Sequence, residues 1–496
     1  MSYEKLIKNI GRIKIKTQYL PTGDIEKDAN VIVEMLKETY RIHKKNVSDM
    51  EILKKFYDNY QTIEKHKEMR TDIDNYVEVP DVFRITRDLN GHICGSGVKF
   101  SDRSGEKEKQ ILSFNKYMEN TSFDATYLKA NKNASLYGVG YYYLEPNNEF
   151  LDVESPFVIE SENLDPKITY CVYSQDIIPK KVWGVWVNKI KEVGKYTEKL
   201  VFNVWCEYAQ YTVECQNSKY KVIKHYPLVF NSIPIIEVQR NEDRIGDSEL
   251  ALSAIKAKNM LFSNRIDDVQ QVVDYVYVLY NLTTGENEDG SKKAINDILK
   301  SRVIELEVVS PTVQPKIDII KNPLNQSEIQ TLADYLDEII NIIVALPDRN
   351  SDSTGTSDTG IANDYKLGFR NLESYSDTVT VYIKKSLKQI INIILRIVEN
   401  TSYKNELSNL SINDIEIKPQ RNKIFSITDT ANAYSTLRKA GFNDEDAIKI
   451  TNASQDIAET AKKNRLEKEQ AQKDAIAFAN LQKEQNQEGD LEKTNE

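Results

Sequence analysis

The sequence predicts an α+β fold that is mainly helical. Apolar residues recur at three- and four-residue spacing over most of the chain, which is typical of amphipathic helices. One central stretch instead contains short segments rich in Val, Tyr and Trp, which favour strands. At 496 residues, with 40% hydrophobic side chains, the chain is long enough to bury a large core.

The first 137 residues are expected to be mostly helical. An amphipathic surface helix is predicted over Asp28–His43, with apolar residues at Val31, Met35, Leu36 and Tyr40. A second helix is predicted over Phe123–Tyr137. Strands are then expected at Val139–Leu144, Val182–Val187, Leu200–Glu207 and Tyr220–His225.

The strand-rich part contains the three tryptophans of the chain, Trp183, Trp186 and Trp205. Indole rings can stack on nucleic-acid bases, but a tryptophan in a mixed sheet more often buries its large apolar surface in a core or an interface. We therefore predict a structural role for these three residues.

The helical pattern then returns in two helices that flank a small αβ insert. The first is predicted over Asp247–Val273, with Asp247 as its N-cap. The second begins with the capping-box-like pair Asn325 and Glu328 and ends before Pro347. The insert is predicted to contain a strand, a helix and a strand, at Asp274–Asn281, Lys292–Lys300 and Val303–Val309.

The second of these helices has two chemically different sides. One side is apolar and is expected to pack on the first helix; it consists of Ile329, Leu332, Leu336, Ile340 and Ile343. The other side is polar and consists of Thr331, Asp334, Glu338 and Asn341.

The segment Asp348–Thr359, DRNSDSTGTSDT, has no apolar residue and is predicted to be a mobile loop. The longest helical pattern follows, from Gly360 to about Asn400. A helix of that length spans roughly 60 Å, which favours a strut across the molecule.

A strand at Ile415–Lys418 precedes two helices divided at Gly441, with Asn443 as the cap of the second. From Thr460 the chain is nearly all charged and amide residues with alanine, which predicts a solvated helix and then a disordered tail by Gly489.

The charge balance argues against an adhesive nucleic-acid-binding domain. The net charge is −10 and the sequence pI is about 5.3, whereas such domains usually have a basic face and a high pI. Any contact with DNA is therefore expected to be local or non-adhesive.

No motif indicates an enzyme, a metal or a cofactor. The four cysteines and four histidines are scattered, and the sequence has no phosphate-binding loop, dinucleotide fingerprint or nucleophile elbow. The acidic stretch Glu242–Glu249 contains an arginine and is interpreted as a solvated helix cap instead of a metal site. We thus predict no catalytic residue, no metal and no cofactor.

No segment is expected to enter a membrane. The most apolar stretches, Ile339–Leu346 and Ile390–Val398, are shorter than the about 20 residues that a bilayer requires. The segment Met1–Lys16 has no signal-peptide pattern. We expect a soluble protein made in a cytoplasm.

Several stretches follow one another in an order that resembles a known family: Asn133–Tyr141, Ser232–Asn241, Ile245–Glu249, Asn264–Asp268, Ser357–Leu367 and Ile415–Asn422. With the two helices, the insert, the polar loop and the long helix, this order resembles the portal protein of tailed bacteriophages, in the type common in phages of Gram-positive hosts. Two features depart from the family: Thr428–Gly441 lacks the expected glutamate-rich start, and the charged tail after Thr460 has no counterpart.

The resemblance implies a portal fold with wing, stem, clip and crown, a long spoke helix and amphipathic stem helices. The implied regions are the wing (1–235), first stem helix (236–273), clip (274–322), second stem helix (323–346), tunnel loop (347–359), long wing helix with a returning strand (360–425), crown helices (426–485) and a disordered tail (486–496).

The resemblance also implies a function. Twelve subunits would form a ring at the unique capsid vertex of the virion, after assembly in the host cytoplasm. Double-stranded DNA would be packaged through the ring, and later ejected, without sequence specificity. The implied partners are further copies of the chain, the terminase large subunit, head–tail adaptor proteins, and the major capsid and scaffold proteins, with no membrane.

Two groups of residues are expected to face the DNA. The first is the tunnel loop, Asp348, Arg349, Asn350, Ser351, Asp352, Ser353, Thr354, Gly355 and Thr356; the second is the polar stripe of the second stem helix, Thr331, Asp334, Glu338 and Asn341. A ring of twelve such chains carries roughly 120 negative charges, so a sliding polyanion meets repulsion instead of adhesion.

Two other functions compete with this one. Another virion structural protein, such as a scaffold or minor head component, suits the long terminal helix and the charged tail, but does not readily explain two helices that flank an αβ insert. A nucleic-acid-processing enzyme requires a carboxylate or histidine cluster, and the sequence shows none.

Overall fold

The computed structural model describes residues 10–60, 75–103, 105–144, 150–151, 156–161, 181–191, 198–228, 231–273, 276–284, 306–320, 326–347, 368–398, 404–407, 409–421, 427–451, 460–461 and 463–476. The chain divides into two compact units, Met1–Pro419 and Gln420–Glu496. The expected helix at Lys292–Lys300 and the expected loop at Asp348–Thr359 lie outside the described residues.

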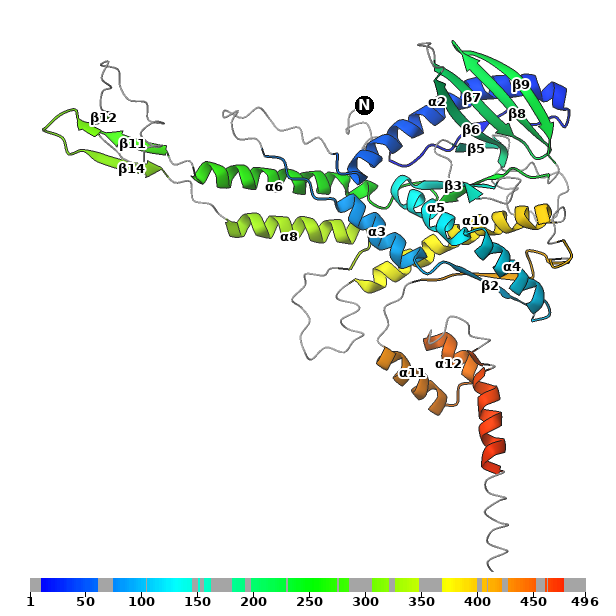
Figure 1. The fold of residues 1–496 in the computed structure, drawn as a ribbon. Coiled ribbons are helices and arrows are strands. Elements are labelled where there is room, and N and C mark those ends of the chain that lie inside the picture. The colour runs from blue at the N-terminus through cyan, green and yellow to red at the C-terminus, as the bar shows by residue number, and fades with distance from the viewer. Residues whose placement is uncertain are drawn as a thin grey trace, which may run out of the picture. The chain divides into compact units, whose positions relative to one another are not determined.

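One core of the first unit lies between a long helix and a six-stranded sheet (Figure 1). Helix α2 (Ile25–Tyr57) begins at Asp24, whose carboxylate accepts hydrogen bonds from the backbone N–H groups of the next turn. The strand order is β1-β5-β6-β7-β8-β9. These strands are β1 (Lys16–Thr17), β5 (Pro156–Ser161), β6 (Lys181–Lys191), β7 (Glu198–Trp205), β8 (Ala209–Gln216) and β9 (Lys219–Pro227).

The tryptophans of this sheet are structural, as predicted. Trp183 and Trp205 are buried, and the Trp183 indole N–H donates to the backbone oxygen of Tyr19 at 2.8 Å. Trp186 is half-buried and packs against Tyr143. Their apolar surface is therefore used within the chain and does not form a stacking platform.

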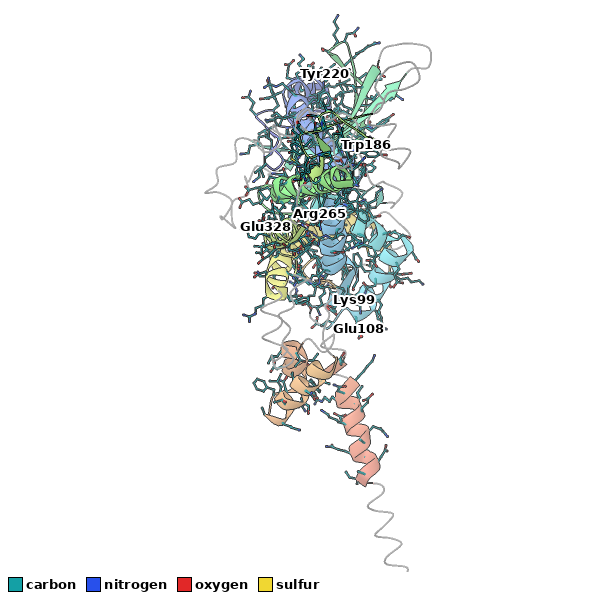
Figure 2. The ribbon with its side chains drawn as sticks, turned by 90° about the vertical axis from the view of Figure 1, so that its left-hand side faces the viewer. Lys99, Glu108, Trp186, Tyr220, Arg265 and Glu328 are labelled. Carbon is teal, nitrogen blue, oxygen red and sulfur yellow. The ribbon has the colours of Figure 1, made fainter. Side chains whose placement is uncertain are left out.

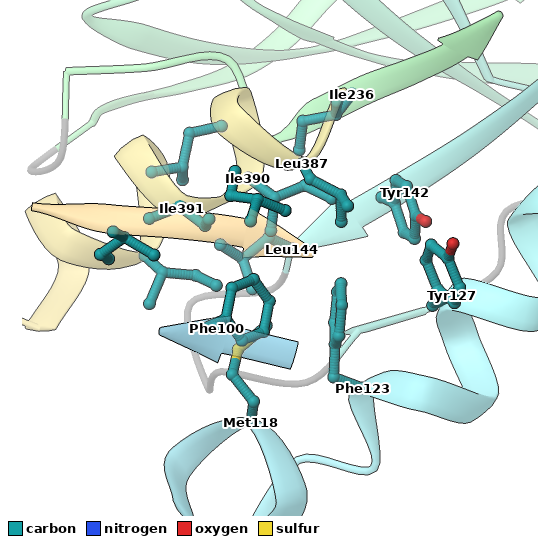
Figure 3. Close-up of a cluster of buried hydrophobic side chains, with 14 of the residues drawn as sticks. Phe100, Met118, Phe123, Tyr127, Tyr142, Leu144, Ile236, Leu387, Ile390 and Ile391 are labelled. Carbon is teal, nitrogen blue, oxygen red and sulfur yellow. The ribbon is translucent and has the colours of Figure 1, made fainter. Parts of the chain in front are cut away.

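A second core joins segments that are far apart in the sequence. It includes side chains of α4 (Glu108–Asn120), α5 (Phe123–Tyr137), β2 (Val98–Asp102), β3 (Val139–Leu144), β10 (Ile235–Gln239), α10 (Phe369–Val398) and β15 (Ile415–Pro419). Figure 3 shows Phe100 and Phe123 below Leu387 and Ile390 of α10. Strand β3 lies between β10 and β4 (Phe150–Leu151), and β2 pairs with β15. The predicted long helix is thus confirmed over residues 369–398 as a strut through this core.

The predicted pair of helices is also present, and the described part of the insert between them forms strands where two were predicted. Helix α6 (Leu252–Val273) follows the 3-10 turn η2 (Glu249–Ala251) and lies beside α8 (Gln326–Ile343) (Figure 1). Antiparallel pairs form between β11 (Val276–Tyr280) and β14 (Lys316–Ile320), and between β12 (Leu282–Thr284) and β13 (Leu306–Val308). Helix α3 (Asp81–Cys94) supports the inner end of the pair.

The second unit contains α11 (Ile427–Lys439) and α12 (Asp444–Thr451). Gly441 has a φ of 93°, which is the left-handed conformation that ends a helix. Asn443 caps α12, because its Oδ1 accepts the backbone N–H of Asp446 at 2.6 Å. Both predictions are confirmed, and residues 463–476 form a largely exposed helix.

Candidate functional site

The two sides of α8 were the strongest functional prediction within the described residues. The side that packs on α6 carries the buried residues Ala333 and Ile340, and Val344, just after the end of α8, is also buried. Ile340 was expected there, but Leu332 and Ile343 are exposed, so the predicted packing side was wrong for these two. Ala333 is buried instead, at helical spacing from Gln330 and Asp337, which accept hydrogen bonds from Arg265 and Lys258 of α6.

The predicted polar stripe divides into two parts. Thr331, Asp334 and Glu338 are exposed, and the Gln330 amide donates to Asp334 Oδ1 at 2.7 Å. Asn341 is half-buried, and its Oδ1 accepts two hydrogen bonds at 3.3 Å from the guanidinium group of Arg84 in α3. Three of the four residues thus present polar atoms to solvent, while the fourth anchors α8 to α3.

A buried lysine joins the three helices at this place. Lys258 of α6 donates from Nζ to Asp81 Oδ2 at 3.0 Å and to Asp337 Oδ1 at 2.5 Å. Lys258 and Asp81 are both buried, and Asp81 opens α3, where the helix dipole favours a negative charge. Because one ammonium group neutralises carboxylates of α3 and α8, the three helices share one electrostatic contact.

A second ionic cluster holds the start of α6 against the sheet and α10. Arg240 donates to both carboxylate oxygens of Asp247, at 2.7 and 2.6 Å. The hydroxyls of Tyr375 and Ser135 donate to the same carboxylate at 2.5 and 2.6 Å. Burial by itself would lower the pKa of Arg240, but the adjacent Asp247 carboxylate has the larger effect, so the pKa of Arg240 is raised. Burial also raises the pKa of Tyr375.

This cluster corrects two predictions for the stretch Glu242–Glu249. Asp247 does not cap a helix, because its carboxylate is turned inward to Arg240. Glu249 is also buried: it accepts the backbone N–H groups of Gly11 and Gly246 at 2.9 and 3.0 Å and pairs with the guanidinium group of Arg12. Glu242 and Asp243 are exposed, but Asp247 and Glu249 are buried ion-pair partners, so this end of the stretch is an ionic junction and not a solvated cap.

Close backbone contacts reinforce the junction. Gly138 has a φ of +80°, and a Cβ atom there would lie 1.9 Å from the backbone oxygen of Arg244. A Cβ atom at Gly246 would lie 2.4 Å from the backbone oxygen of Leu136. Only glycine permits this approach between the end of α5 and the loop before α6.

The described residues hold no group of three or more His, Cys, Asp or Glu side chains that could bind a metal ion. In the same part of the chain, no helix is long and apolar enough to cross a membrane. The nine predicted loop residues, 348–356, lie outside the described residues. What the described site offers is a firmly anchored helix pair that presents two carboxylates and a hydroxyl of α8 to solvent.

Sequence reasoning did not identify Lys258, Asp81 or Asp337. One observable pattern points to the first of them: Lys258 lies between Ile255 and Leu261 on the apolar side of its helix, where a charge requires a partner. The identity of that partner depends on contacts across 177 residues of sequence, which no local pattern reveals.

Comparison with known families identifies a match over most of the chain. The model of the family described as phage portal protein, SPP1 Gp6-like, matches residues 36–474. None of the curated proteins matches the chain.

Proposed function

Because this chain belongs to the SPP1 Gp6-like family of phage portal proteins, we propose that it forms the ring through which double-stranded DNA enters the phage head and later leaves it. The family match, which extends over residues 36–474, is the observation that carries this proposal. Portal proteins are structural components of the virion, so the work of translocation belongs to another protein. We propose that a terminase performs it.

Helices α6 and α8 are proposed as the stem, that is, the wall of the channel. The support is the chemistry of α8, whose exposed Thr331, Asp334 and Glu338 bring polar and negative groups to one side. Each Lys or Arg contact to a phosphate strengthens DNA binding through counterion release, which would slow sliding. A wall of carboxylates and hydroxyls guides a polyanion without holding it.

The remaining regions are proposed by their order in the chain. The insert between α6 and α8 would be the clip, on which terminase and then head–tail adaptor proteins dock. Residues 1–235 and 360–425 would form the wing, in contact with capsid and scaffold proteins, and residues 426–485 the crown. The loop 348–356 would lie at the narrowest point, where Arg349 gives each subunit one contact to phosphate. Twelve subunits in the virion are proposed on the same basis.

The channel lining is tested by reversing its charge. The double variant Asp334→Lys and Glu338→Lys changes each subunit by four charges at exposed positions, so assembly should survive. Packaging and retention of DNA in complemented phage should both change, because a ring of new lysines grips the phosphates.

The matched control is Glu38→Lys with Glu51→Lys, the same change at exposed positions of α2. This control should package DNA normally. If the α8 variant packaged and retained DNA as the control does, the proposed lining would be wrong.

A further inference from the structure

The second half of helix α10 has two sides of different chemistry. One side is apolar and is buried in the second core, where Figure 3 shows Leu387 and Ile390. At 3.6 residues per turn, the cations of this half lie on the opposite side, within an arc of about 120° and along roughly 18 Å of the helix. All four are exposed, and we call them the basic face of α10: Lys384, Lys385, Lys388 and Arg396.

The charge of this face is not cancelled within the helix. The sequence contains no aspartate or glutamate from residue 378 to residue 398. Among the residues that the structure describes, no carboxylate forms an ion pair with Lys384 or Lys388. Arg396 donates to the backbone oxygen of Asn231 at 2.7 Å, which is a neutral acceptor. The basic face therefore keeps its positive charge.

The acidity of the whole chain does not remove this local attraction. The net charge is −10, but the Debye length is about 10 Å at 0.1 M salt, so exposed acids farther away than this are largely screened. A polyanion that approaches α10 interacts first with four closely spaced cations. An acidic chain can thus carry a surface that attracts negative charge.

We propose that the basic face of α10 binds the phosphate backbone of double-stranded DNA. This inference rests on the proposed function for the choice of DNA as the partner. Lysines contact phosphates without reading the base sequence, and roughly 18 Å of helix corresponds to about five phosphates of one strand at 3.4 Å each. Protein interfaces are instead depleted of lysine and enriched in aromatic side chains. The chemistry of this face therefore favours a nucleic acid over a protein partner.

The basic face lies apart from the proposed channel lining. Helix α10 begins at the inner end of α8, where Leu372 belongs to the same hydrophobic cluster as Ile340. Figure 2 looks toward this end from the outer end of the pair, where Arg265 of α6 and Glu328 of α8 are labelled. Lys384 lies 12 residues beyond Leu372, which is roughly 18 Å along the helix.

The two surfaces suit different states of the DNA because their charges are opposite. The carboxylates of α8 repel phosphates and so favour sliding. The cations of α10 bind phosphates and release counterions, which favours holding. We therefore assign moving DNA to the acidic side of α8 and DNA at rest to the basic face of α10.

The test is the binding of a closed circular DNA duplex to rings of the full chain. A closed circle has no end to thread through a ring, so its binding reports on surfaces outside the channel. In fluorescence anisotropy at low salt, the double variant Lys384→Gln with Lys388→Gln should bind the circle about tenfold more weakly than the wild type. The slope of log K against log salt should become shallower by about 1.8, since each lost phosphate contact removes about 0.9.

The matched control is Lys45→Gln with Lys55→Gln, which removes two exposed lysines of α2. It should bind the circle as the wild type does, and the circular dichroism melting curves of all three chains should coincide. Equal binding by the α10 variant and the control would overturn the inference. Loss of rings in the α10 variant would also overturn it, because the face would then be a contact between subunits. A wild-type chain that forms no ring would instead refute the proposed function, and the same titration on the monomer would still decide the role of α10.

Discussion

Replacing Lys258 with methionine tests whether one buried ammonium group holds α3, α6 and α8 together. Methionine preserves most of the side-chain volume but leaves the buried Asp81 and the partly exposed Asp337 without this partner. Removal of one member of a buried ion pair costs roughly 3–5 kcal/mol. Arg84 remains 3.2 Å from the Asp81 carboxylate, so we expect the lower end, a loss of about 3 kcal/mol.

The assay is urea unfolding together with hydrogen exchange of the amides in the three helices. The variant should unfold at lower urea concentration and exchange faster in α3, α6 and α8. The control Lys388→Met, an exposed position of α10, should change the free energy of unfolding by less than about 0.5 kcal/mol. Adding Asp81→Asn to the Lys258→Met chain removes the stranded charge and should restore part of the loss.

Two results would refute this reasoning. One is a Lys258→Met chain as stable as the Lys388→Met control. The other is strict additivity of Lys258→Met and Asp81→Asn, because two residues in one ionic contact are expected to be coupled by at least about 0.5 kcal/mol.

Three further predictions concern other parts of the first unit. Gly138→Ala should destabilise the chain far more than Gly23→Ala, because both glycines have positive φ but only the first has a backbone oxygen in the place of the new Cβ; equal losses in urea unfolding would contradict this. Burial lowers the pKa of His43 from 6.5 to about 4. Between these two pH values the unfolded chain binds a proton that the folded chain does not. The free energy of unfolding therefore falls by about 3 kcal/mol as pH falls from 7 to 4. His43→Phe should remove that part of the pH dependence, and an unchanged difference between the two pH values would disprove the assignment. Tyr375→Phe removes a donor to the buried Asp247 carboxylate and should cost about 2 kcal/mol in the free energy of unfolding; no loss would show that the hydroxyl does not support this junction.

Local chemistry was sufficient to predict many elements of the fold. Helix α5 and strand β3 have the predicted bounds because Gly138 lies between them in the left-handed conformation. This conformation ends the helix, and the extended strand begins at the next residue. Gly441, in the left-handed conformation, ends α11, and the Asn443 side chain caps the start of α12. Such boundaries depend on neighbouring residues alone.

The orientation of α8 and the ionic junction depended on partners far along the chain. Arg12 and Glu249 are separated by 237 residues, and their pairing turned an apparent surface cap into a buried contact. On α8, the hydrogen bonds of Gln330 and Asp337 with Arg265 and Lys258 of α6 turn Ala333 inward and leave Leu332 exposed. A pattern of apolar residues shows that a helix has an inner side, but the partner decides which residues occupy it.

A single-particle reconstruction of the purified full-length chain tests the central claim most directly. The account predicts a closed ring with an open centre, in which Asp334 and Glu338 of every subunit line the opening. A particle without a central opening, or a ring whose lumen is lined by other elements while α8 lies on the outside, would contradict it.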